Sequence, residues 1–421
     1  MYQKTTLKNG LRLITSPMPN LQSVSVGVFV GAGSRYENRP QAGISHFIEH
    51  LLFKGTHMRP TSRDIAATID SVGGVLNGGT DKESTVYWCK VAHAHFSLAL
   101  NLLADMIRHS LLNSDDIESE RRVITEELNM EMDSPSQRAD MLINELLWPD
   151  HPLGQEIVGY KETLTDMSRE MILDFVTHQY TPSNIVISIA GGISTEEAIS
   201  CIEEAFGDWK TTQPVIPFLP ANGIRKKQRI QTETRETEQV NLCLAVPGLS
   251  STHPDRFILN IFNAVLSGGM SSRLFVEIRD KRALAYDIHS YTDYLSDTGA
   301  LVIYAGVNPA NTGNAITAIL EEIKKAIEKI PDDELAKTKE YIKGRLLLRM
   351  EDSSHVSSWL GTQELMKETI MTVDDINHAI DAVTKADVQR VSQKLFTSEN
   401  LLLALVGPLD KQGNIEDLLR I

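Results

Sequence analysis

The chain contains 421 residues, enough for two or three ordinary domains; 42% of them are hydrophobic and 23% are charged. Its formal net charge of −15 repels phosphate groups, so we expect neither nucleic acid nor an anionic membrane surface as a partner. The three cysteines, Cys89, Cys201 and Cys243, lie far apart without metal-binding or redox spacing, which argues against a disulfide framework. Because the start of the chain lacks the apolar stretch of a signal peptide, we expect a cytoplasmic protein.

The first half of the chain is predicted to mix strands with helices. Alternating apolar and β-branched residues predict strands over residues 10–14, 23–30, 77–91 and 184–190. Apolar residues at helical spacing predict helices over residues 43–53, 62–72, 96–110, 115–132 and 168–180.

The second half repeats parts of the first. The segment from Gln239 to Val246 resembles residues 22–30, and the segment from Phe396 to Gly407 resembles residues 180–192. Both pairs are about 216 residues apart, which indicates a duplicated domain rather than a solenoid. Helices are predicted near residues 254–267, 272–282, 310–329, 332–351 and 385–395.

This order of elements predicts the α+β fold class. We expect two homologous α/β sandwich domains related by internal duplication, each a mostly antiparallel sheet with helices packed on one face. The first domain is placed at residues 1–213 and the second at residues 229–421. Between them, residues 214–228 fall in a stretch rich in proline and polar residues and are the predicted linker.

The most informative motif lies on the helix predicted first in the chain. Ser45 or the turn before it can start this helix, and Gly55 can end it. His46 and His50 are four residues apart, so both rings project from one face and can reach one metal ion. Glu49 flanks that face and can take the proton from an attacking water, as in zinc peptidases. The pattern is H-x-x-E-H, the reverse of the commoner H-E-x-x-H.

A third metal ligand is available on the helix predicted at residues 115–132. Glu120 and Glu127 are seven residues apart, which places them on one stripe of that helix, two turns from each other. Other glutamates crowd the same helix, so a solvated acidic face is the alternative interpretation. Composition does not choose between Glu126 and Glu127 as the ligand.

Two runs of residues resemble a known family. The run from Gly31 to Glu37 and the run from Gly43 to Thr56 are similar to the pitrilysin and mitochondrial processing peptidase family, whose members share the inverted H-x-x-E-H motif. The family includes insulin-degrading enzyme and bacterial processing-type peptidases of about this length. The resemblance covers nearly the whole chain.

The resemblance implies a set of roles around one zinc ion. It implies that His46, His50 and Glu127 hold Zn²⁺, because the family's spacing selects this glutamate over its neighbour. It implies that Glu49 acts on the attacking water. Glu120 matches an accessory carboxylate of the family that orients a ligand or tunes its charge.

The resemblance also assigns residues that bind substrate in the second half. The segment from Ser267 to Tyr286 is similar to a family segment that carries an arginine and a tyrosine seven residues apart, here Arg279 and Tyr286. Both side chains could donate hydrogen bonds to a peptide carbonyl or to its developing oxyanion.

A glycine-rich segment resembles the edge strand beside the family's active site. It contains Asn77, Gly78, Gly79 and Thr80, and an extended peptide could pair with such an edge through backbone hydrogen bonds. Relatives often carry alanine at the position of Gly78, so strand pairing there is expected to be more flexible in this chain.

The metal ligands are not repeated in the second half. The offset between the halves carries the segment from His46 to Glu49 to residues 263–266, which hold no ligand. One half is therefore expected to do the chemistry while the other shapes the substrate chamber. The resemblance implies a homodimer in which the partner chain's second domain completes the site with Arg279 and Tyr286.

The predicted function is a zinc metalloendopeptidase that cuts peptides, or unfolded or leader segments, in an enclosed dimeric chamber. The alternative is a non-catalytic core or partner subunit of a processing or respiratory-type complex. Such relatives usually lose part of the metal motif, whereas this chain keeps all of it. A zinc hydrolase for non-peptide amides is a third possibility with little family support.

Overall fold

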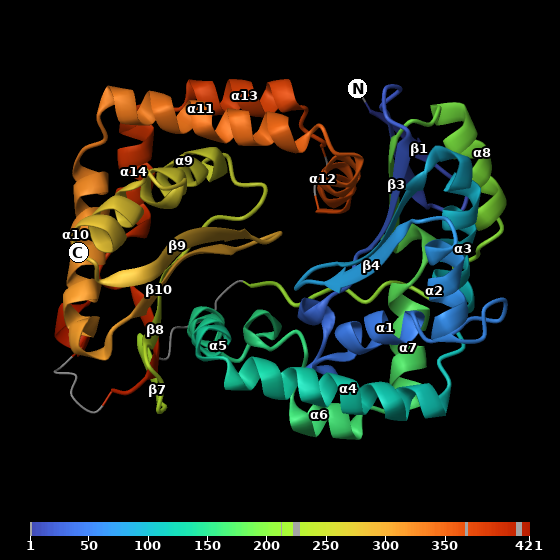
Figure 1. The fold of residues 1–421 in the computed structure, drawn as a ribbon, viewed down its shortest axis with the longest axis horizontal. Coiled ribbons are helices and arrows are strands. Elements are labelled where there is room, and N and C mark those ends of the chain that lie inside the picture. The colour runs from blue at the N-terminus through green and yellow to red at the C-terminus, as the bar shows by residue number, and fades with distance from the viewer. Residues whose placement is uncertain (1, 212, 222–227, 367–368, 410–414) are drawn as a thin grey trace. The chain divides into compact units, whose positions relative to one another are not determined.

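The computed structural model describes residues 2–211, 213–221, 228–366, 369–409 and 415–421. The chain forms two compact units (Figure 1). Unit 1 comprises residues 1–129, 155–219 and 348–370, and unit 2 comprises residues 130–154, 220–347 and 371–421. No helix of the described residues combines the length and the apolar character needed to cross a membrane.

Unit 1 is built on a six-stranded sheet. In spatial order its strands are β1 (Gln3–Thr6), β2 (Arg12–Pro17), β6 (Ile185–Gly191), β3 (Ser23–Val30), β5 (Thr85–Ala92) and β4 (Val75–Thr80). Only β2 and β6 run parallel, and every other neighbouring pair is antiparallel. Among the described residues of unit 1, strand β4 lies at the edge and pairs with β5 alone, so its other backbone edge has no partner strand there.

Helices cover both faces of this sheet (Figure 1). On one face lie α3 and α8, and on the other lies α12, where Phe29 of β3 packs against Val356 and Leu360. A hydrogen bond of 2.8 Å between the hydroxyls of Ser25 and Ser353 joins the same two elements. The helices of unit 1 are α1 (Ile44–Leu52), α2 (Ser62–Asp70), α3 (Phe96–His109), α6 (Lys161–Asp166), α7 (Arg169–Gln179), α8 (Thr195–Phe206), α12 (Ser353–Met366) and most of α4 (Ser114–Asp133).

Among the described residues, unit 2 repeats the sheet of unit 1 without a counterpart of β1. In spatial order the strands are β7 (Ile230–Thr234), β11 (Leu402–Gly407), β8 (Val240–Pro247), β10 (Gly299–Val307) and β9 (Ala285–Tyr294). This order matches β2, β6, β3, β5 and β4, and the single parallel pair occupies the same place in both sheets. The strands predicted from the two repeated segments are β3 with β8 and β6 with β11, so the internal duplication is confirmed.

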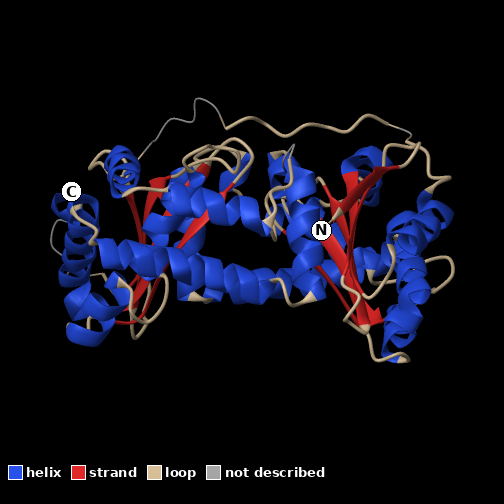
Figure 2. Cartoon of the chain, turned by 90° about the horizontal axis from the view of Figure 1, so that it is seen from above, coloured by secondary structure: helices blue, strands red, loops and turns tan. Residues whose placement is uncertain are grey.

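The sheet of unit 2 also lies between helices, as the red strands in Figure 2 show. Alternate side chains of its strands pack against α9, α10 and α14, and the intervening ones pack against α5. The helices of unit 2 are α5 (Pro135–Leu147), α9 (Arg256–Ser267), α10 (Thr312–Glu328), α13 (Val373–Ala382), α14 (Lys385–Leu395) and most of α11 (Asp332–Arg349).

The predicted fold class is confirmed, but the expectation of helices on one face of each sheet is wrong. Helices cover both faces, because each half gives one helix to the unit built mainly from the other half. Helix α5 comes from the first half of the sequence but packs in unit 2, and α12 comes from the second half but packs in unit 1. The contiguous domains predicted at residues 1–213 and 229–421 stay a prediction. Of the predicted linker at residues 214–228, residues 222–227 lie outside the described residues.

One predicted strand is wrong. Residues 77–91 form the end of β4 and most of β5, an antiparallel hairpin rather than one strand. The polar run from Asp81 to Ser84 makes the turn, in which the Asp81 amide donates to the Ser84 carbonyl at 2.8 Å. Alternation of apolar residues on both sides of this short turn concealed it.

The packing of α12 against β3 can be tested at a glycine. A Cβ atom at Gly361 would lie 2.3 Å from the ring of Phe29, so we expect Gly361→Ala to lower the free energy of unfolding by about 1–3 kcal/mol. Gly344→Ala in α11 is the control, because a Cβ there would meet no described atom within 4 Å apart from its chain neighbours and the backbone of its own helix. The control is expected to be neutral or to stabilise by up to about 1 kcal/mol. Urea denaturation of both variants measures the difference, and equal midpoints would contradict the packing.

Candidate metal centre

Helix α1 carries the two histidines, and the residues before it fix where it begins. Its N-cap is Gly43 with φ +95°, in the left-handed region that favours glycine. The buried Glu37 carboxylate accepts hydrogen bonds from the backbone amides of Gly43 and Ser45 at 2.8 and 2.9 Å. Burial raises the pKa of Glu37 to about 7, and these hydrogen bonds act in the opposite direction. The helix therefore starts at the preceding turn, one of the two starts predicted, with Gly43 as its N-cap and the Glu37 carboxylate accepting from the amides of its first turn.

His46 and His50 converge with Glu127 of α4. The Nε2 atoms of the two histidines lie 3.8 and 3.5 Å from the same oxygen, Oε2 of Glu127. Each of the three residues offers one ligand atom, and these three atoms all lie within 4.8 Å of one another. The described part of the chain contains no other such group of metal-ligating side chains. Two ligands about 2.0–2.1 Å from a tetrahedral ion are about 3.3–3.4 Å apart. The two nitrogen–oxygen distances exceed this separation by a few tenths of an ångström, so the three side chains are close enough to converge on one zinc ion.

The two imidazoles are prepared for metal binding in different ways. The pKa of His46 is lowered to about 4, mainly by burial and to a lesser extent by the neighbouring His50. The ring of His46 is therefore neutral near pH 7. The Nδ1 atom of His50 lies 3.1 Å from Oε2 of Glu120. A proton on Nδ1 donated to this carboxylate leaves the Nε2 lone pair facing Glu127.

Glu120 is itself held by a residue to which the sequence assigned no role. Its carboxylate is buried, and its other oxygen lies 2.5 Å from the ammonium group of Lys54. Lys54 lies four residues after His50, in the turn that follows the end of α1 at Leu52. That spacing was the available signal.

Glu49 is on the same helix as the two histidines and contacts strand β4. The Thr80 hydroxyl donates a hydrogen bond of 2.6 Å to Oε2 of Glu49. Burial, more than any other cause, raises the pKa of Glu49, and the negative charge of Glu127 acts in the same direction. The hydrogen bond from Thr80 and the charge of His50 lower it. A carboxylate with a raised pKa is a stronger base than an exposed one.

The predicted edge-strand residues lie on β4, which contacts α1. A Cβ atom at Gly78 would lie 3.2 Å from Cγ of Glu49, so this position brings the strand against the predicted base. At Gly79 a Cβ atom would meet nothing within 4 Å. The Asn77 side chain accepts a hydrogen bond of 2.8 Å from the Gly78 amide and so turns back onto its own strand.

Arg279 and Tyr286 contact each other in unit 2, whereas His46, His50 and Glu127 are in unit 1. The guanidinium carbon of Arg279 lies 4.6 Å from the ring centre of Tyr286 and 4.8 Å from that of Phe275. Tyr286 is 77% exposed, so this cation–π pair presents an aromatic face and hydrogen-bond donors to solvent.

The family model described as insulinase, peptidase family M16, matches residues 12–161, and the model described as peptidase M16 inactive domain matches residues 166–342. The chain therefore belongs to peptidase family M16, the family of pitrilysin and the processing peptidases.

Curated relatives of this chain are named zinc proteases. The uncharacterized zinc protease YmxG of Bacillus subtilis (strain 168) is 36% identical over 97% of this chain and 98% of its own length. An uncharacterized zinc protease of Streptomyces coelicolor is 34% identical over 98% of this chain and 91% of its own length. At this level the comparison supports a protease-like protein.

Solved structures share the fold at lower sequence identity. A protease from Helicobacter pylori superposes with a TM-score of 0.91 at 24% identity, covering 97% of this chain and 99% of its own. A Pseudomonas fluorescens protein titled peptidase M16 inactive domain gives 0.89 at 17% identity, covering 97% and 98%. A chain of complex III from Candida albicans gives 0.84 at 18% identity, covering 100% of both chains. These likenesses establish the fold and leave the activity to the site.

The choice between Glu126 and Glu127 can be tested by metal content. Glu127→Gln removes an anionic ligand and is expected to weaken zinc binding by at least about 100-fold. Glu126→Gln is the matched control, because this neighbour is exposed and absent from the ligand group. Competition with a chromophoric chelator measures both affinities. Zinc binding that survives in the Glu127 variant and fails in the Glu126 variant would contradict the assignment.

Proposed function

We propose that the chain is a zinc metalloendopeptidase that cuts peptides, including unfolded or leader segments. The observation that carries this proposal is the complete ligand group of His46, His50 and Glu127, with the carboxylate of Glu49 on the same helix. Relatives named zinc proteases add support for the metal.

The residues around the metal would divide the work of peptide hydrolysis. A zinc ion held by His46, His50 and Glu127 would supply Lewis-acid chemistry to a water and to the scissile carbonyl. Glu49 would accept the proton of the attacking water and later deliver it to the leaving amine. Glu120, through its contact with His50 Nδ1, would keep that ring oriented.

Strand β4 would bind the substrate as an additional strand. Its outer edge is unpaired within unit 1, and backbone hydrogen bonds to such an edge give affinity with little dependence on side chains. Because strand addition requires an extended backbone, peptides and unfolded segments are the substrates that fit.

We further propose that the active protein is a homodimer that encloses its substrate. No second ligand group occurs in the described residues of unit 2, and the family resemblance gives that half a role in substrate binding. Arg279 and Tyr286 of the partner chain would donate hydrogen bonds to the substrate carbonyl or its oxyanion. The cytoplasmic location expected from the sequence stays a prediction.

A non-catalytic core or partner subunit is the alternative function. Its support is the fold, which the chain shares with a complex III chain and with a protein titled inactive domain. The complete ligand group and the position of Glu49 favour the peptidase.

Replacement of the proposed base separates these functions. Glu49→Gln keeps the ligands and is expected to retain zinc while kcat on a quenched-fluorescence peptide falls by about 10²- to 10⁴-fold. The unaltered protein is expected to cleave the same peptide and to lose this activity with a chelator. A protein that stays inert after zinc is added would favour the subunit, and near-normal activity of the variant would remove Glu49 from its role.

Mixed dimers test whether the partner chain completes the site. A heterodimer of one Glu49→Gln chain and one Arg279→Ala chain would contain one intact site, so about half of the wild-type activity is expected. Two affinity tags on co-expressed chains isolate this species.

The arrangement is checked by moving both substitutions onto one chain. A wild-type chain paired with a chain carrying both changes would have no intact site if Arg279 acts across the dimer, and one intact site if it acts within its own chain. Activity in this pairing and none in the first would contradict the proposal.

A further inference from the structure

Strand β4 contacts Glu49 at two of its six residues. Thr80 donates its hydroxyl to Oε2 of Glu49 at 2.6 Å. At Gly78 the strand comes so close that a Cβ atom would lie 3.2 Å from Cγ and 3.4 Å from Oε1 of Glu49. The Glu49 carboxylate therefore rests against the strand, with one oxygen held by a hydrogen bond and the other beside a residue without a side chain.

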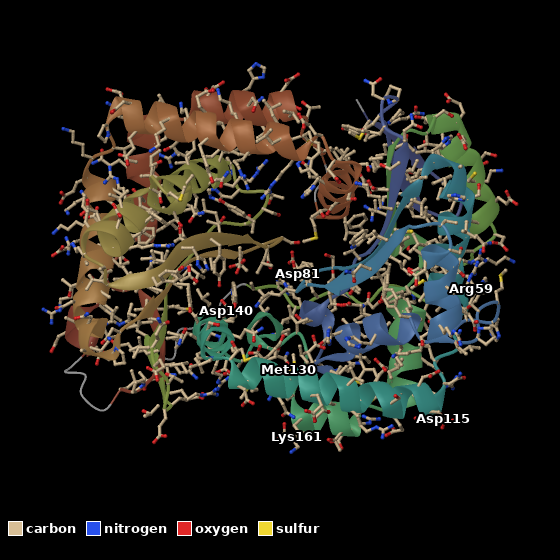
Figure 3. The ribbon with its side chains drawn as sticks, in the orientation of Figure 1. Arg59, Asp81, Asp115, Met130, Asp140 and Lys161 are labelled. Carbon is tan, nitrogen blue, oxygen red and sulfur yellow. The ribbon has the colours of Figure 1, made fainter. Side chains whose placement is uncertain are left out.

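The hydroxyl of Thr80 is held on a rigid part of unit 1. Thr80 is the last residue of β4 and pairs with Thr85, the first residue of β5. Asp81, labelled in Figure 3, begins the short turn between them and donates its amide to Ser84. Thr85 is buried and donates its own hydroxyl to the Ala32 carbonyl at 2.9 Å, which ties the hairpin to the end of β3.

We infer that Thr80 is a positioning residue for Glu49, an inference that rests on the proposed function. A free glutamate side chain samples many rotamers, and a base that has to find its geometry during the reaction loses rate. By engaging Oε2, the Thr80 hydroxyl restricts the carboxylate before substrate arrives and leaves Oε1 for proton transfer. The peptide is also proposed to pair with β4, so the same strand would position both the bound peptide and the Glu49 carboxylate.

Two substitutions at this position separate positioning from substrate binding. Thr80→Val keeps the shape and removes the donor, so kcat is expected to fall by about 10- to 100-fold with KM changed by less than about threefold. Thr80→Ser restores the donor and is expected to stay within about threefold of wild type. Thr6→Val is the matched control, because Thr6 ends the strand at the opposite edge of the same sheet.

A second measurement needs no activity. The unfolding midpoints of Thr80→Val, Glu49→Ala and the double variant are measured in chelator, without metal. If the two side chains interact, Thr80→Val lowers the midpoint in the wild-type background and has no comparable effect once Glu49 is alanine. Equal shifts in both backgrounds would show that the contact does not exist and would overturn the inference.

The outcomes distinguish the inference from the proposed function. Coupled midpoints together with a fall in kcat that serine reverses support the positioning role. Coupled midpoints with unchanged kcat, or a rise in KM alone, overturn it. An inert wild-type protein with zinc would contradict the proposed function, and the coupling of the midpoints would still decide whether Thr80 holds Glu49.

Discussion

The contact between helices α1 and α4 through the buried Glu120 carboxylate is the interaction on which the candidate site depends. One oxygen of this carboxylate faces Nδ1 of His50 and the other faces the ammonium of Lys54, so the contact joins α4 to the last turn of α1 and to the turn that follows it. Because Glu127 lies two turns further along α4, the same contact sets where its carboxylate meets the two Nε2 atoms. Without this alignment, the H-x-x-E-H helix would present two of the three ligands.

The charges of the site favour a divalent cation. Glu49, Glu120 and Glu127 place three acidic side chains around the two histidines, and the ammonium group of Lys54 is a cation beside them. Three like charges in a partly buried space repel one another, and an ion of charge +2 relieves that repulsion. The second copy of the fold keeps the strand order but has no such group among its described residues. The two copies therefore share the strand order of the sheet, and the candidate metal ligands lie in the first copy.

Features set by local periodicity could be predicted from the sequence, whereas features set by the packing of distant segments could not. The four-residue spacing of His46 and His50 fixes one helical face, and that prediction needed no tertiary information. The choice between Glu126 and Glu127 depends on which side of α4 faces α1, which composition does not contain. Helices α5 and α12 were not predicted. The apolar face of a helix also does not indicate which of the two sheets it will pack against. The contacts of Lys54 and Thr80 were missed because each joins side chains from different elements.

The central claim is that two imidazoles and one carboxylate hold a single zinc ion beside Glu49. X-ray absorption at the zinc edge of the loaded protein tests it most directly, because the spectrum reports the donor atoms themselves. We predict nitrogen and oxygen donors at about 2.0–2.1 Å with the scattering signature of two imidazoles. A shell of sulfur at about 2.3 Å, or a spectrum without imidazole, would contradict the account.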